Sequence, residues 1–173
     1  MKKLLLLICF LQCTHSFSQD LATLKWWSPT QYKSHVIEGQ AWPDEVKSTY
    51  DRLPARAEGN VADDVWSLSS HSAGLMIRFR SNTKKIIVRY ETKNKDNYAM
   101  DHMPATGVSG IDLYAIDSDG KELWCAGTRS FSDTITYRFQ GLRANDTYHE
   151  KGREYRLYLP LYNQVNSLEI GVD

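Results

Sequence analysis

The stretch Met103-Pro-Ala-Thr-Gly-Val-Ser-Gly-Ile-Asp-Leu-Tyr-Ala115 is the most informative part of this chain. Side chains alternate between the two faces of a strand, so Ile111 and Leu113 share one face while Asp112 and Tyr114 share the other. A strand that is apolar on both sides suits a central position between two layers, where a buried Asp112 needs a hydrogen-bond partner. The glycine just before Ile111 allows a bulge or a close backbone approach at the start of the strand.

The same period-two alternation recurs along most of the chain and predicts an all-β fold. Apolar and polar residues alternate in short runs bounded by turn residues, at 75–80, 86–91, 155–160 and 168–172. Asp117-Ser-Asp-Gly120 joins residues 111–116 to 121–126, which predicts a hairpin with glycine where a positive φ is needed. No segment shows a sustained 3.6-residue stripe. We therefore expect an antiparallel two-layer β-sandwich of jelly-roll type.

Two segments interrupt this alternation. Residues 26–64 are rich in proline, tryptophan and charge, so we expect them to wrap the sandwich with at most one short strand near residues 36–40. Residues 93–109 form the longest loop of the β region, and loops of this length in compact domains tend to be functional. This loop offers stacking area, hydrogen-bonding groups and a carboxylate on our candidate ligand-binding or domain-interface residues, Asn97, Tyr98, Asp101 and His102.

The signature Gly110-Ile-Asp-Leu-Tyr114, with four other segments in the same order, resembles the domain that precedes the catalytic domain in bacterial SGNH (GDSL-type) esterases. The other segments are Ile37-Glu-Gly-Gln-Ala-Trp-Pro43, Tyr50-Asp-Arg-Leu-Pro-Ala-Arg56, His71-Ser-Ala-Gly74 and Gly152-Arg-Glu-Tyr-Arg-Leu-Tyr-Leu-Pro-Leu-Tyr162. The resemblance covers roughly residues 26–173 and assigns Gly110, Asp112, Leu113 and Tyr114 to the family signature. It implies a parent enzyme that removes acyl groups from carbohydrate, and a module that docks on that enzyme's hydrolase domain.

Catalytic residues of such an esterase are not evident in this chain. Asp146-Thr-Tyr-His149 matches the D-x-x-H element of SGNH hydrolases, but a triad also needs a serine on a strand-to-helix turn and oxyanion donors. There is no G-D-S block and no G-x-S-x-G elbow, and Gly107-Val-Ser-Gly110 precedes a strand. We therefore expect an accessory half without its catalytic domain. An autonomous hydrolase that uses Asp146 and His149 stays open as a third hypothesis.

Residues 1–19 are interpreted as a signal peptide, with Lys2 and Lys3 before a short apolar core and small residues near its end. We expect a mature domain of residues 20–173, exported to the periplasm or the outside of the cell and without a membrane span. Cys9 and Cys13 leave with this segment, and neither follows the small residue that lipidation favours. Only Cys125 remains, as a small buried residue that forms no disulfide or zinc site.

Charge and metal-ligand patterns exclude other classes of function. Lysine plus arginine equals aspartate plus glutamate at 21 each, so nothing indicates a nucleic-acid partner. Asp117-Ser-Asp-Gly120 lacks the later ligands of a calcium loop. Asp101 and His102, taken with His71 or His149, match no ligand spacing that we recognise. We expect no metal and no cofactor.

Aromatic residues are abundant, with five tryptophans and ten tyrosines. Sugar rings stack on exposed aromatic rings, while polar side chains orient their hydroxyl groups. We expect Trp66 and Trp124, each read as lying in a strand, to fill the core, and Tyr98 is open to either role. The leading hypothesis is an exported, non-catalytic esterase module that assists deacylation of carbohydrate esters. The alternative is a free-standing carbohydrate-binding β-sandwich, which needs an aromatic platform independent of any partner.

Overall fold

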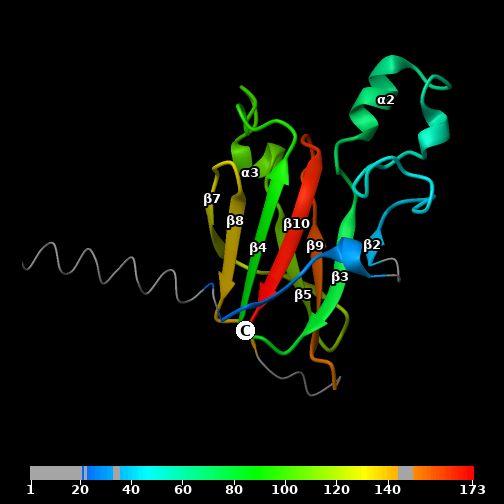
Figure 1. Cartoon of the computed structure of the whole chain (residues 1–173). Helices are drawn as coiled ribbons and strands as arrows, with labels where there is room; N and C mark the ends of the chain where they lie inside the picture. The colour runs from blue at the N-terminus through cyan, green and yellow to red at the C-terminus, as the bar shows by residue number, and fades with distance from the viewer. Residues whose placement is uncertain (1–20, 22, 33–35, 144–149) are drawn as a thin grey trace, which may run out of the picture.

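A computed structural model describes residues 21, 23–32, 36–143 and 150–173 of the chain (Figure 1). The candidate signal peptide and the segment Asp146-Thr-Tyr-His149 lie outside these residues. Two five-stranded antiparallel sheets face each other across a shared core. None of the helices in the described ranges is long and apolar enough to cross a membrane.

Each sheet combines strands from distant parts of the chain. The first, named here the β4 sheet, has the order β1 (Lys25–Trp27), β10 (Val165–Val172), β4 (Lys85–Thr92), β8 (Ile135–Gln140) and β7 (Gly127–Ser130). The second, the signature sheet, has the order β2 (Ile37–Glu38), β3 (Met76–Ser81), β9 (Arg153–Tyr158), β5 (Asp112–Ile116) and β6 (Glu122–Trp124). The signature strand is β5.

The strand order is that of a jelly roll, which confirms the predicted fold class. Early strands pair with late ones, β1 with β10, β3 with β9 and β4 with β8, as in one long hairpin rolled over on itself. The chain passes from one sheet to the other between β3 and β4, between β4 and β5, and again between β8, β9 and β10. This interleaving distinguishes a jelly roll from a simple meander.

The core lies between the sheets and follows the alternation seen in the sequence. Ile77, Val88 and Leu157 are completely buried, and each lies two residues from another inward-facing side chain. Each such side chain contributes about 1.5–3 kcal/mol through its removal from water. Residues 75–80, 86–91, 155–160 and 168–172 therefore all belong to strands or their immediate ends, as predicted.

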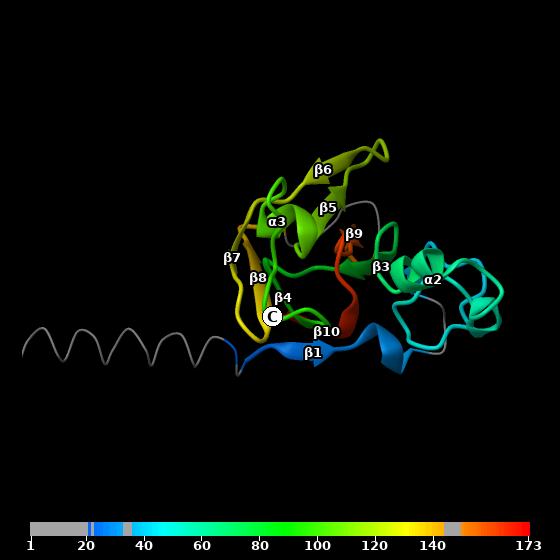
Figure 2. The same ribbon diagram turned by 90° about the horizontal axis from the view of Figure 1, so that it is seen from above.

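The segment 26–64 was expected to wrap the sandwich with at most one short strand, but it takes part in two strands. It contains β1 and β2, the 3-10 helices η1 (Pro29–Gln31) and η2 (Ala55–Ala57), and the first residues of helix α2 (Asp63–Ser69). Figures 1 and 2 show its later part, together with α2, beside the β2–β3 edge of the signature sheet. Ile37 reaches the core from β2, and Tyr50 anchors the later part of the segment because its ring is buried in the same core.

The β5–β6 hairpin forms at the predicted turn. Asp117 Oδ1 accepts the backbone N–H groups of Asp119 at 3.0 Å and Lys121 at 2.8 Å, and Gly120 has a φ of 78°. Pairing across this hairpin places Tyr114 opposite Trp124. The turn thereby decides which side chains of β6 share a face with the signature.

Candidate functional site at the signature strand

Signature residues of β5 divide between the core and the outer face of the signature sheet. Leu113 is completely buried between the sheets. Tyr114, on the outer face, packs edge-on against Tyr158 with ring centroids 5.6 Å apart and planes at 89°. Asp112 is exposed on the same face, and its Oδ1 accepts a hydrogen bond from Trp124 Nε1 at 3.1 Å. The strand is therefore apolar on one face only, and the carboxylate has its partner at the surface.

Gly110 permits a close backbone approach, one of the two roles expected of it. A Cβ atom at this position would lie 2.3 Å from the carbonyl oxygen of Thr106 and 2.6 Å from the hydroxyl oxygen of Tyr137. Both distances are far below van der Waals contact. Glycine at the start of β5 therefore lets the one-turn helix α3 (Ala105–Val108) sit against the strand.

Ser109 is the buried hub that holds the 93–109 loop in place. Its hydroxyl donates to the carbonyl of Tyr98 at 3.0 Å and accepts from Asn163 Nδ2 at 3.0 Å. Its own carbonyl accepts the Tyr90 hydroxyl at 2.7 Å. Buried polar groups of this kind are satisfied and specify one loop conformation.

The four candidate residues of this loop occupy three different settings. Asn97 Oδ1 accepts the Ala99 N–H at 3.1 Å in a local turn, and the Tyr98 hydroxyl donates to the carbonyl of Ser132 at 2.9 Å. Asp101 and His102 are exposed at the tip of a turn that two backbone hydrogen bonds close between Met100 and Met103. The structure therefore does not gather the four around one cavity.

A cavity of about 350 Å³ lies instead beside the signature strand. Its lining residues come from α3 and from the edge strands β6 and β7, together with β5 and β8. We call it the signature cavity. Its walls are the indole of Trp124 and the ring of Phe139, and its polar groups come from Thr106, Asp112, Arg129 and Tyr137. Aromatic walls with a few convergent polar groups are typical of small-ligand sites.

Burial sets the protonation of two groups in this cavity. It raises the pKa of Tyr137, whose hydroxyl therefore stays protonated at physiological pH. It also raises the pKa of the Cys125 thiol, which keeps the sulfur uncharged and poorly nucleophilic. Cys125 is buried and free, in agreement with its expected role as a small core residue.

The core assignment of the two tryptophans was wrong. Trp124 is 60% exposed because β6 is a three-residue edge strand whose outer face nothing in the described chain covers. Trp66 lies in helix α2, half-buried, with Lys47 Nζ 5.7 Å from its ring centroid. The hairpin pairing sets this ring opposite Tyr114 on the outer face, and the edge position of β6 leaves that face open.

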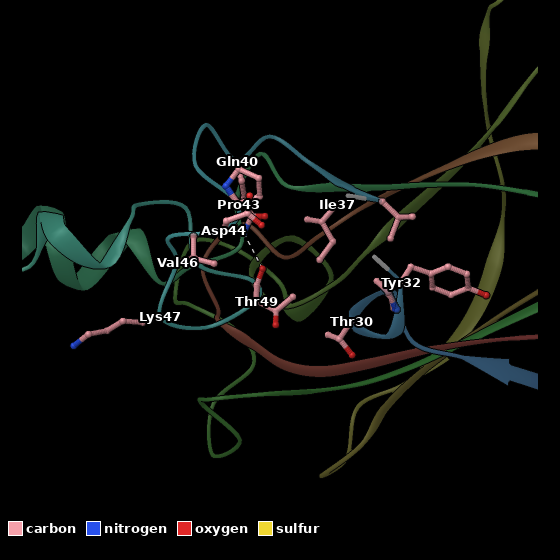
Figure 3. Close-up of a pocket in the computed structure, with 11 residues that line it drawn as sticks. Thr30, Tyr32, Ile37, Gln40, Pro43, Asp44, Val46, Lys47 and Thr49 are labelled. Atoms are coloured by element: carbon pink, nitrogen blue, oxygen red, sulfur yellow. Dashed lines mark hydrogen bonds between the residues drawn. The ribbon is translucent and has the colours of Figure 1, made fainter. Parts of the chain in front are cut away.

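A second cavity, also of about 350 Å³, lies between η1 and residues 37–49 (Figure 3). Gln40 Nε2 donates to the carbonyls of Thr49 and Asp51 at 2.7 Å each, so its amide donors are engaged within the chain. Lys47 points away from the cavity in Figure 3. We interpret this cavity as a packing gap between the sandwich and residues 40–70, which we call the side segment.

Metal ligands do not cluster within the described ranges, where no group of three or more His, Cys, Asp or Glu side chains is placed to hold an ion. His71 is partly buried, and burial lowers its pKa. His149, the other histidine considered with Asp101 and His102, lies outside the described residues.

Comparisons with known proteins agree with the sequence resemblance. The family model described as GxDLY, the N-terminus of SGNH-hydrolase-type esterases, matches residues 24–173. The chain is also similar to a solved structure described as a GDSL-like lipase from Bacteroides ovatus, with a TM-score of 0.72 and 24% identity. The match covers 87% of this chain and 41% of that one, so this chain spans less than half of its length. No curated protein matches.

Proposed function

The chain belongs to the GxDLY family, the domain at the N-terminus of SGNH-hydrolase-type esterases, and from this premise we propose that it is a non-catalytic module that assists deacylation of carbohydrate esters. In this proposal the module is exported and works beside an SGNH catalytic domain. The observation that carries the proposal is the signature cavity, where the family's own Asp112 holds an exposed tryptophan at the cavity wall.

A non-catalytic role is supported by the use the fold makes of its nearest nucleophile candidate. In Gly107-Val-Ser-Gly110 the serine is buried, and its hydroxyl bonds to Tyr98 and Asn163. It follows α3 and precedes β5, whereas a serine-hydrolase nucleophile sits on a turn from strand to helix with oxyanion donors around it. The Ser109 hydroxyl therefore holds a loop in place.

A carbohydrate ligand is supported by the chemistry of the signature cavity. Trp124 presents an apolar ring to solvent, and the hydroxyl, carboxylate and guanidinium groups beside it suit the many hydroxyls of a sugar. The same exposed ring favours the alternative function, a free-standing carbohydrate-binding module. The two differ in whether a hydrolase domain is needed for the module to act.

The test compares an SGNH catalytic domain with and without this chain joined ahead of it. We expect the module to raise acetate release from acetylated xylan several-fold and to leave hydrolysis of 4-nitrophenyl acetate unchanged. The full chain alone should not hydrolyse 4-nitrophenyl acetate above background. Robust turnover by the chain alone that disappears in His149→Ala would show an autonomous hydrolase instead.

The 93–109 loop is proposed as the part of the module that faces the catalytic domain. Tyr98→Ala and His102→Ala, made in the joined enzyme, should then weaken turnover of acetylated xylan while the fold, followed by far-ultraviolet dichroism, stays intact. Lys84 is exposed between β3 and β4, and Lys84→Ala is the control, which should change neither the turnover nor the fold. Wild-type turnover in both loop variants would remove this loop from the function and leave it a structural buttress.

A further inference from the structure

Three aromatic rings lie in a row on the outer face of the signature sheet. Trp124 on β6 is opposite Tyr114 on β5, and Tyr158 on β9 is opposite Asp112 on β5, so all of them share this face. We call Tyr114, Trp124 and Tyr158 the aromatic platform. In Figure 2, β5 and β6 form the boundary of the molecule on their side, and the platform is continuous with the signature cavity through Trp124.

Two hydrogen bonds and one ring contact hold these rings in fixed orientations. Trp124 donates its indole N–H to Asp112, and the Tyr158 hydroxyl donates to Glu122 Oε1 at 3.1 Å. Tyr114 is wedged edge-on against Tyr158. Rings that are already ordered lose little conformational entropy when a ligand stacks on them, which favours binding.

Charged groups around the platform neutralise one another. Arg156 pairs through Nη1 with Glu122 at 2.7 Å and through Nε with Glu154 at 3.3 Å, and Glu154 also pairs with Arg80 at 3.1 Å. A face whose charges are paired internally has little attraction for a polyanion or a polycation. Its paired carboxylates and guanidinium groups still offer hydrogen bonds to hydroxyl groups.

We propose that the aromatic platform binds an uncharged glycan chain side-on, with sugar rings stacked on Trp124 and Tyr114 and hydroxyl groups bonded to Glu122 and Arg156. Neighbouring strands are about 4.8 Å apart, so rings on three adjacent strands extend over roughly 10 Å, more than a single sugar ring. The platform therefore engages consecutive units of a polymer. This inference rests on the proposed function only for the identity of the polymer, because binding here needs no hydrolase.

The test is native gel electrophoresis of the full chain through gels that contain a polysaccharide. The probes are acetylated xylan, the same xylan after alkaline de-esterification, and polygalacturonate as a polyanion. Both xylans should retard the wild type. Trp124→Ala should weaken this binding by about tenfold or more, and Trp124→Phe, which keeps a ring, should retain part of it. Trp42→Ala removes another exposed tryptophan, one that stacks on Arg56 in the side segment, and should bind like wild type.

Several outcomes would overturn the platform. These are no retardation by either xylan, tighter retention by polygalacturonate, and full binding by Trp124→Ala with an unchanged thermal midpoint. If instead Trp124→Ala abolished association with a separate SGNH domain and left xylan binding intact, the face would be a protein interface. If the platform did not bind xylan but the joined module still raised acetate release, the proposed function would stand without the platform. If Trp124 carried xylan binding but the joined module gave no gain in acetate release, the platform would stand and the proposed function would fail.

Discussion

Gly110 is the residue on which the geometry of the signature depends most directly. Gly110→Ala pushes a Cβ into the backbone carbonyl of Thr106, so we expect a loss of roughly 1–3 kcal/mol or more in the free energy of unfolding. Gly107→Ala is the matched control, because its Cβ would meet only side-chain atoms, Cγ and Sδ of Met103, and no backbone atom, and alanine favours helix α3. Urea denaturation of both variants measures the difference, and equal losses would contradict the close approach.

His71 makes the stability of the folded chain depend on pH. Burial lowers its pKa in the folded chain, so the unfolded chain binds more protons as the pH falls through the ordinary histidine range. The contribution of this group to stability is therefore fully present at neutral pH and is lost on acidification. The shift in urea midpoint between pH 7.5 and pH 5 should be smaller in His71→Gln than in wild type. An equal shift would show that His71 titrates as a solvated side chain.

The β5–β6 hairpin sets the face of the sheet on which Trp124 lies. Asp117 Oδ1 accepts two backbone N–H groups in the turn, so Asp117→Ala should cost about 1 kcal/mol of stability and accelerate exchange of the Lys121 amide. Asp119→Ala removes the neighbouring exposed carboxylate and is the control. If the two variants exchanged alike, the turn would be held by Gly120 and the strands alone.

For the whole molecule, we expect two levels of protection from hydrogen exchange. Strands β3, β4 and β10 bury side chains on a shared core, whereas the side segment of residues 40–70 has Tyr50 as its large buried anchor. Amides of that segment should therefore exchange through local opening, well before those of the sheets. Far-ultraviolet dichroism should show a β-rich spectrum. Protection of residues 40–70 equal to that of β4 would contradict this hierarchy.

Local patterns were enough to predict the sandwich, the hairpin turn and the family. Ile77, Val88 and Leu157 each stand in a period-two run, and that period is a property of the strand itself, whichever strand pairs with it. Gly120 follows the same logic, since the turn needs a positive φ that glycine adopts freely. The signature and its four companion segments are likewise read from the order of residues alone.

Only the tertiary structure decided which residues are exposed on the signature sheet and which surround its cavity. Trp124 stands in the continuous apolar run of residues 123–126, but β6 is an edge strand whose outer face no layer of the described residues covers. The cavity brings Thr106, Asp112 and Arg129 together from three separate elements. The physical reason is that burial of a strand face depends on contacts between segments distant in sequence, whereas the alternation that makes the strand is local.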